Sequence, residues 1–174
     1  MTGVSDRSAT TTAIVVGNPR PASRTLAAAT LLHQELVGRD ADIVIDLADL
    51  GAEILDWSSS TVAGLVKQVG EADLVIVASP TYKSAYTGLL KVFLDRFAGG
   101  TGLAGVAVPL MLGAGPAHAL APELTLRPVL TELGATVPGR GVYVIETDHD
   151  DPAAYADWLG ATRPTVEALL EVRA

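Results

Sequence analysis

Short runs of apolar residues recur along the chain, each ended by glycine, serine or proline and separated from the next by longer amphipathic stretches. Three of these runs, at residues 13–16, 74–78 and 106–112, contain no alternating polar residues, as expected for strands that are buried on both faces. Strands of this kind occur in parallel sheets because the crossover helices cover both faces of the sheet. The alternation therefore predicts an α/β fold with a parallel sheet between two helical layers.

Two shorter strands and five helices complete the predicted pattern. Residues 42–47 alternate apolar and polar side chains, with Asp42 and Asp46 on the polar face, which is typical of an edge strand with one face in water. A last strand is expected at residues 142–145. Apolar residues at helical spacing predict helices at residues 25–36, 60–69, 88–97 and 119–133, and a closing helix that begins at Asp151-Pro152.

Local signals refine the ends of these elements. Ser60 is the expected N-cap of the second helix. Pro109 lies inside the fourth strand, where its missing N–H is awkward for a central position. Pro128 is expected to kink the fourth helix, and Gly160 or Pro164 is expected to break the closing helix.

Length and charge limit the classes of protein to which the chain belongs. Its 174 residues correspond to one domain, and 49% apolar residues are sufficient for a core of ordinary size. The formal net charge of −8 argues against nucleic-acid binding, which requires a basic face. The chain has no cysteine, so disulfides, thiolate metal sites and cysteine nucleophiles are excluded.

An uncharged segment in the middle of the chain does not indicate a membrane span. Residues 97–122 contain no Asp, Glu, Lys or Arg, but six glycines and three prolines interrupt them, whereas a spanning helix needs about 20 mainly apolar residues. Residues 1–12 hold six Ser/Thr and no apolar segment of a secretion signal. We expect a disordered tail at residues 1–12, a folded domain at residues 13–174, a cytoplasmic location and no membrane contact.

The loop after the first strand, residues 17–25, has the composition of an anion site. It places an amide, two hydroxyls and two guanidinium groups directly before a helix: Asn18, Ser23, Thr25, Arg20 and Arg24. Unpaired N–H groups and the positive end of the helix dipole favour an anion there, and guanidinium groups suit phosphate oxygens. The loop matches neither G-x-x-x-x-G-K nor G-x-G-x-x-G. The alternative is a solvated turn in which Ser23 is only the N-cap of the helix.

Two further loops follow the third and fourth strands. Residues 79–88 include Tyr82, Lys83 and Tyr86, which are two of the eight aromatic residues and one of the three lysines. Such a loop suits a planar, partly apolar ligand, and the alternative is a rigid turn whose tyrosines pack on helices. Residues 112–118 contain two glycines that let the backbone approach a ligand closely, and the alternative there is an ordinary flexible connection.

Other polar residues indicate structural roles. His118, at the start of a helix, is more often a cap or a packing residue than a catalytic acid. Residues 148–151 suit helix capping and solvated charge better than a metal site. Ser23 and Ser84 lack a G-x-S-x-G context, so nucleophilic catalysis has little support. We expect neither a bound metal nor a catalytic side chain.

Taken together, the three loops resemble those of the NADPH-dependent FMN reductase family, a flavodoxin-like group, and within it the reductases of alkanesulfonate-type two-component monooxygenases. The family's first loop is of the type Gly-Ser-x-Arg-x-x-Ser-x-Asn/Thr, which residues 17–25 match with Asn18 in place of the serine. Its second motif, Pro-x-Tyr-Lys/Asn-x-x-x-x-Gly-x-x-Lys-x-x-x-Asp, is present from Pro80 to Asp95. Residues 113–130 also resemble that subgroup, and the likeness extends over residues 14–145.

The resemblance implies a flavodoxin-like three-layer fold with a five-stranded parallel sheet of order 2-1-3-4-5 and FMN at the carboxyl ends of its strands. By the same resemblance, the FMN phosphate would bind to Asn18, Arg20, Ser23, Arg24 and Thr25. The isoalloxazine would be lined by Pro80, Thr81, Tyr82, Lys83 and Ser84, largely through their backbone groups. Its pyrimidine end would be bordered by Gly113, Ala114 and Gly115.

The activity implied by the resemblance is NAD(P)H-dependent FMN reduction. A hydride would pass from NADPH or NADH to flavin N5, and the reduced FMN would serve a monooxygenase. A quinone or azo reductase with tightly bound FMN is an alternative, and so is a non-enzymatic flavodoxin-type electron carrier, although flavodoxins use a phosphate loop without arginines. A homodimer or homotetramer is the family's usual state. Leu124 stands where some relatives insert an aromatic residue or His, so whether FMN stays bound is open.

Overall fold

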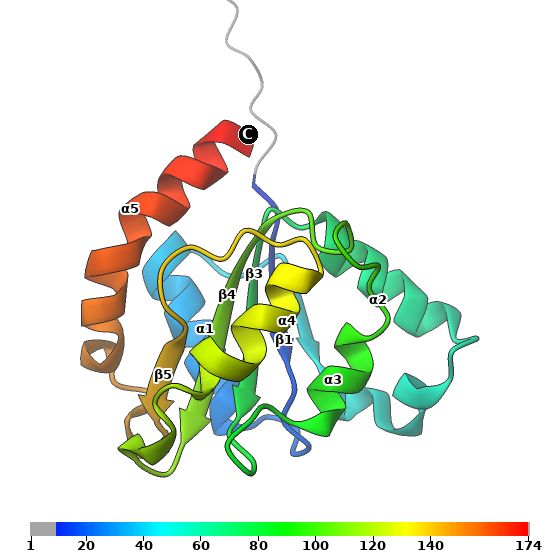
Figure 1. Ribbon diagram of the computed structural model, residues 1–174, viewed down its shortest axis with the longest axis horizontal. Helices are drawn as coiled ribbons and strands as arrows, with labels where there is room; N and C mark the ends of the chain where they lie inside the picture. The colour runs from blue at the N-terminus through cyan, green and yellow to red at the C-terminus, as the bar shows by residue number, and fades with distance from the viewer. Residues whose placement is uncertain (1–9, 174) are drawn as a thin grey trace, which may run out of the picture.

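Five parallel strands form one sheet in the computed structural model, which describes residues 10–173. The strand order is β2-β1-β3-β4-β5, and every neighbouring pair is parallel (Figure 1). The strands are β1 (Thr12–Val16), β2 (Ile43–Asp46), β3 (Leu74–Pro80), β4 (Val106–Gly113) and β5 (Val142–Ile145). The predicted flavodoxin-like order and the positions of all five strands are confirmed.

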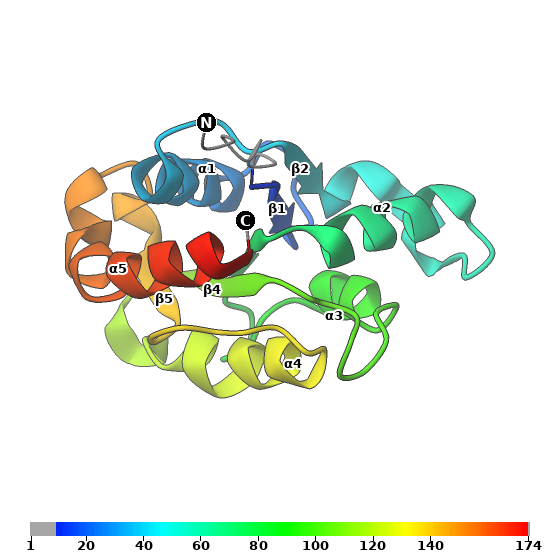
Figure 2. The same cartoon turned by 90° about the horizontal axis from the view of Figure 1, so that it is seen from above.

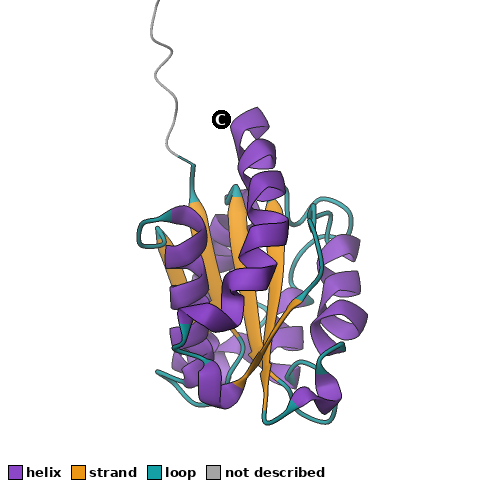
Figure 3. Ribbon diagram, turned by 90° about the vertical axis from the view of Figure 1, so that its left-hand side faces the viewer, coloured by secondary structure: helices purple, strands orange, loops and turns teal. Residues whose placement is uncertain are grey.

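Helices cover both faces of this sheet, as the view from above shows (Figure 2). One face packs against α1 (Arg24–Val37) and α5 (Ala156–Arg173), and the other against α2 (Ser60–Glu71), α3 (Gly88–Leu94) and α4 (Arg127–Glu132). Short helical turns join them: η1 (Leu47–Leu55), η2 (Pro116–His118), η3 (Pro122–Leu126), η4 (Glu146–Asp148) and η5 (Pro152–Tyr155). Seen from the side, the sheet lies between the two helical layers (Figure 3), which confirms the predicted three-layer fold.

Each face of the sheet has its own apolar core. Ile76 belongs to the core under α1 and α5, together with Leu32, whereas its neighbour Val77 faces the core under α2, α3 and α4. In that second core, the rings of Phe93 and Phe97 meet edge to face with their centroids 5.4 Å apart. The central strands are therefore buried on both faces, which is why their sequences lack polar alternation.

Pro109 is accommodated in β4 because its nitrogen faces a gap between segments. The Ala107 N–H donates to the Thr136 carbonyl at 2.9 Å, so this side of β4 faces the segment that leads to β5. Since the backbone alternates with a period of two, the nitrogen of Pro109 points the same way. Pairing with β5 begins only at Leu110, opposite Val142. The proline thus removes no hydrogen bond from the ladder.

The fourth helix is distorted one turn earlier than the expected kink at Pro128. The segment Pro122–Leu126 forms a π-helical turn that leads directly into α4. Pro128 has no N–H to donate to the carbonyl four residues earlier, and the Thr125 hydroxyl donates to the Ala121 carbonyl at 2.6 Å. The wider π-helical turn therefore lets the chain continue into α4 without the hydrogen bond that Pro128 cannot form.

The closing helix is not broken, contrary to the sequence-based expectation. α5 runs through both Gly160 and Pro164 to Arg173. Its buried face includes Leu159, Thr162 and Val166, which pack against the sheet. Tertiary packing of this face outweighs the hydrogen bond that Pro164 removes from the helix.

The start of the domain and one helix cap differ slightly from expectation. Thr12 lies in β1 and is fully buried, although it was expected at the end of the tail, and residues 1–9 of that tail lie outside the described residues. Ser59 caps α2 in place of Ser60, since its hydroxyl accepts the Val62 N–H at 3.1 Å. Within residues 10–173, no helix combines the length and the apolar composition that crossing a membrane requires.

The buried imidazole of His33 on α1 makes stability depend on pH. Its Nδ1 lies 3.0 Å from the Arg39 carbonyl, its Nε2 is buried without a partner, and burial lowers the pKa of this group from the ordinary value of 6.5. The unfolded chain therefore binds a proton at a higher pH than the folded one. The stabilisation is fully present above about pH 6.5 and is lost as the pH falls below that value.

We expect the free energy of unfolding, measured with urea, to decrease between pH 7.5 and pH 5.5, and this decrease to shrink in a His33→Leu variant, which has no imidazole to protonate. His118→Ala serves as the control, because His118 is exposed. An equal dependence on pH in wild type and His33→Leu would show that another group is responsible.

Candidate functional site

The loops after β1, β3 and β4 meet at one end of the sheet, because these strands are neighbours and run parallel (Figure 1). The Thr87 hydroxyl donates to the Gly17 carbonyl at 2.5 Å, which joins the first loop to the second. The Thr81 N–H donates to the Leu112 carbonyl at 2.7 Å, which joins the second loop to the third. All three loops singled out from the sequence are thus brought together and held to one another.

Close packing of α3 against the first loop fixes this arrangement. A Cβ atom added at Gly17 would lie 2.4 Å from the Leu90 Cβ and 3.2 Å from its Cα, so only glycine fits here. Thr87 is also the N-cap of α3, because its hydroxyl accepts the Leu90 N–H at 3.1 Å. One threonine therefore begins α3 and anchors the end of β1.

The polar side chains of the loop after β1 form hydrogen bonds mostly within the loop and with the start of α1. The amide nitrogen of Asn18 donates to the Thr25 hydroxyl at 3.0 Å, and its oxygen accepts the Arg20 N–H at 3.0 Å. The Ser23 hydroxyl accepts the Leu26 N–H at 3.3 Å and caps α1. These contacts give Asn18, Ser23 and Thr25 a role in shaping the loop.

The start of α1 keeps free donors that face away from these internal contacts. Among the described residues, the N–H groups of Arg24 and Thr25 have no hydrogen-bond acceptor, as is usual in the first turn of a helix. Arg20 is exposed and forms no ion pair within residues 10–173, whereas the Arg24 guanidinium lies 3.4 Å from the Glu146 carboxylate. Arg20 and the helix N-terminus are therefore the groups available to an anion.

Asp46 supports this loop, although the sequence suggested only that it lies on the wet face of an edge strand. Its carboxylate accepts the Ala22 N–H at 3.0 Å and the Ala48 N–H at 3.3 Å. Ala22 has a φ of 50°, a left-handed conformation that is unfavourable for a residue with a side chain. Because Asp46 lies 24 residues further along the chain, no local pattern could have indicated this contact.

The loop after β3 contains a tight turn at Lys83 and Ser84. Tyr82 and Ala85 exchange backbone hydrogen bonds of 2.8 and 3.2 Å, and the two residues between them have φ values of 52° and 68°. Two-residue turns of this handedness normally contain Asn and Gly, and side chains at such positions cost about 1 kcal/mol or more each. The backbone of this loop is thus closed into a tight, strained turn.

Two side chains of this loop remain free for a ligand. The hydroxyl of Thr81 is buried and has no hydrogen-bond partner within residues 10–173, which is uncommon for a buried polar atom. Tyr82 is 50% exposed, so its ring is not packed on a helix. Tyr86, in contrast, packs partly against the core, and burial raises the pKa of its hydroxyl.

The loop after β4 passes over the side chain of Tyr143. The Tyr143 hydroxyl donates to the Gly115 carbonyl at 2.7 Å. A Cβ atom at Gly113 would lie 2.0 Å from the Tyr143 oxygen, whereas one at Gly115 would meet no atom within 4 Å. Gly113 therefore makes room for a tyrosine of the protein, and Gly115 faces open space. Tyr143 had no role in the sequence-based expectations.

His118 connects the loops after β3 and β4. Its Nδ1 lies 3.3 Å from the Ser84 hydroxyl at the edge of a cavity of about 380 Å³. Leu120 and Leu124, which are 51% and 66% exposed, line the same cavity beside the π-helical turn. An apolar surface thus continues from the three loops toward α4.

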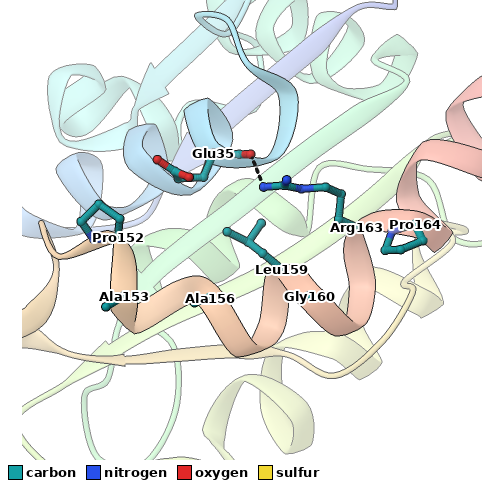
Figure 4. A pocket seen from close by; sticks show the side chains of 8 residues that line it. All are labelled: Glu35, Pro152, Ala153, Ala156, Leu159, Gly160, Arg163 and Pro164. Carbon is teal, nitrogen blue, oxygen red and sulfur yellow. Dashed lines mark hydrogen bonds between the residues drawn. The ribbon is translucent and has the colours of Figure 1, made fainter.

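A larger pocket of about 510 Å³ lies between α1 and α5 (Figure 4). Its charged groups are Glu35 and Arg163, and the Arg163 guanidinium already donates to the Glu35 carbonyl at 2.6 Å. None of the predicted site residues lines it. Within residues 10–173, no group of three or more His, Cys, Asp or Glu could hold a metal ion, and Asp151 caps η5 by accepting the Ala153 N–H at 2.9 Å.

Comparisons with known proteins agree with this geometry. The family model for NADPH-dependent FMN reductase matches residues 10–150. An FMN reductase (NADPH) of Escherichia coli strain K12 is 33% identical over 133 residues, which cover 74% of this chain and 70% of that protein. The NADH-dependent FMN reductase SfnF of Pseudomonas fluorescens strain Pf0-1 is 33% identical over 145 residues, 78% of this chain and 75% of that one.

A solved structure supports the same assignment. The apo form of the NADH:FMN oxidoreductase EMOB superposes with a TM-score of 0.79 and 27% identity, over 94% of this chain and 89% of that chain. Family model, relatives and fold thus agree along most of the sequence. The chain belongs to the NADPH-dependent FMN reductase family.

Proposed function

We propose that this protein is an NAD(P)H-dependent FMN reductase whose flavin site is formed by the loops after β1, β3 and β4. The observation that carries the proposal is the meeting of these loops at one end of the sheet. Among residues 10–173, Arg20 has no ion pair, the first N–H groups of α1 have no acceptor and the buried Thr81 hydroxyl nearby has no partner. A phosphate monoester joined to a flat heteroaromatic ring requires these two kinds of group side by side.

The residues present fit FMN in three respects. The N-terminus of α1 and Arg20 offer donors and positive charge to a phosphate. The buried Thr81 hydroxyl lacks a partner that a ring atom would supply. The open space at Gly115 lets the backbone of the third loop approach the ring edge. Tyr82, half-exposed beside these groups, would border the flavin or the nicotinamide.

Bound FMN would supply the redox chemistry, taking up a hydride from the reduced nicotinamide and passing on two electrons. The chain itself would orient the ring and supply hydrogen-bond donors. The N–H groups of Ala114 and Gly115, which have no acceptor among the described residues, would stabilise negative charge at the ring edge. No side chain is required to donate or accept a proton in the hydride step.

We propose the nucleotide from the relatives' names, and the partner from the resemblance of the loops to reductases of two-component monooxygenases. Both NADPH and NADH are named among the relatives, so we propose that either nucleotide serves as donor. Reduced FMN would then pass to a flavin-dependent monooxygenase. We also propose a cytoplasmic location and a homodimeric or homotetrameric state.

The proposal is tested by steady-state oxidation of NADPH and of NADH, with and without added FMN. We expect oxidation that depends on FMN and saturates with it, together with quenching of FMN fluorescence on binding. Absence of turnover with both nucleotides at saturating FMN would refute the reductase and favour an electron carrier. Turnover that requires a quinone or an azo dye, with FMN that does not dissociate, would favour the alternative enzyme classes.

A further inference from the structure

We propose that Tyr143 on β5 is a positioning residue for the flavin, because it holds the Gly115 carbonyl away from the ring-edge site, where the N–H groups of Ala114 and Gly115 are available as donors. This inference rests on the proposed function. It concerns the loop after β4, where the Tyr143 hydroxyl holds the Gly115 carbonyl at 2.7 Å.

Contacts around Tyr143 show that the loop is built over its side chain. Gly113 could not carry a Cβ atom, which would lie 2.0 Å from the tyrosine oxygen and 2.9 Å from Cζ. The ring is partly buried against the core beneath α4, and burial raises the pKa of its hydroxyl, so the group is a neutral donor at physiological pH. The loop therefore has one orientation while Tyr143 is in place.

The hydrogen bond from Tyr143 to the Gly115 carbonyl determines which backbone groups of this loop can face a ligand. Gly115 is followed by Pro116, which has no N–H, so the peptide group between them presents only a carbonyl as a polar group. With that carbonyl held by Tyr143, the N–H groups of Ala114 and Gly115 remain without an acceptor among the described residues. The pyrimidine edge of a flavin presents two carbonyl oxygens and N1, which accept hydrogen bonds from such donors, and a single N–H at N3. A carbonyl oxygen turned toward N1 or the neighbouring ring oxygen would repel them.

The test compares wild type with Tyr143→Phe for binding of FMN and of riboflavin, which shares the ring but lacks the phosphate. Without the hydroxyl, the Gly115 carbonyl is free to turn. We expect both flavins to bind about five-fold more weakly, the factor that corresponds to one neutral hydrogen bond. We also expect the midpoint potential of bound FMN to become more negative, because reduction adds charge to the ring edge that these donors stabilise.

Tyr155→Phe is a matched control. The Tyr155 hydroxyl also donates to a backbone carbonyl at 2.7 Å, that of His149, but its ring lies in the core under α1 and α5. We expect a similar loss of thermal stability in both variants, with unchanged flavin affinity and potential in Tyr155→Phe. Equal flavin affinity and potential in wild type and Tyr143→Phe would overturn the inference. A loss for FMN but not for riboflavin would also overturn it, because the effect would then lie at the phosphate.

A second pair of variants tests the packing on which the inference depends, with stability as the readout. Gly113→Ala alone should destabilise the protein, and Tyr143→Leu in the same chain should relieve part of that loss, because the shortened side chain no longer reaches the new methyl group. Strictly additive effects would contradict the assigned contact. If wild type binds no flavin at all, the proposed function fails, and that outcome is distinct from failure of the Tyr143 assignment.

Discussion

Replacing Arg20 with alanine is expected to weaken FMN binding by about 10- to 100-fold, the range that corresponds to one charge-assisted hydrogen bond. Arg20 precedes the free N–H groups of α1, is exposed, and forms no ion pair within the described residues. Its guanidinium is therefore available to phosphate oxygens at no loss of an internal contact.

Riboflavin separates this effect from a general disturbance of the site. Because riboflavin has no phosphate, its affinity should be the same in wild type and Arg20→Ala. Arg24→Ala should lower FMN affinity less than Arg20→Ala, since the Arg24 guanidinium lies 3.4 Å from Glu146. Lys67→Ala, which removes the same charge from α2, should leave both affinities unchanged. Unaltered FMN binding in Arg20→Ala would remove Arg20 from the phosphate site.

Gly17→Ala is expected to destabilise the folded protein by about 1–3 kcal/mol, the usual range for a side chain forced into a packed interior. The new methyl group would meet both the Cβ and the backbone Cα of Leu90, at 2.4 and 3.2 Å, so α3 would have to move away from β1. Movement of α3 would also break the hydrogen bond from Thr87 to the Gly17 carbonyl. Flavin binding should weaken together with stability.

Thermal unfolding followed by circular dichroism provides the measurement. Each kcal/mol corresponds to a fall in Tm of roughly 2–4 °C for a chain of this size. Gly64→Ala is the control, because Gly64 lies within α2 and an added Cβ would meet no atom within 4 Å. That substitution should raise stability by about 0.5–1 kcal/mol, since alanine favours helix. A Tm for Gly17→Ala at or above that of wild type would show that α3 packs differently.

The strands and the loops that carry the site were predictable because their signals are local. A strand buried on both faces shows itself as an uninterrupted apolar run, as in residues 74–78, and the loops follow directly after such runs. The strand order came from the family resemblance, since apolar periodicity carries no information about which strands are neighbours.

Side-chain contacts that form only in the folded loops escaped prediction for a physical reason. Asn18 and Thr25 were expected at the phosphate, but the amide of one donates to the hydroxyl of the other, which only the folded loop reveals. Gly113 was expected at the ring edge, and the structure shows that it also makes room for Tyr143. The hydrogen-bond partner of a polar side chain depends on which groups lie near it in the folded protein. Spacing along the chain does not specify those positions.

The position of Pro109 in β4 has a consequence for association between copies of the sheet. Strand β5 is four residues long and pairs with β4 only from Leu110 onward. Since Pro109 offers no N–H on that side, β5 or any foreign strand in its place finds no donor there with which to extend the ladder toward the start of β4. A strand that took the place of β5 could therefore pair with β4 only from Leu110 onward, which keeps the stretch open to edge-to-edge pairing short.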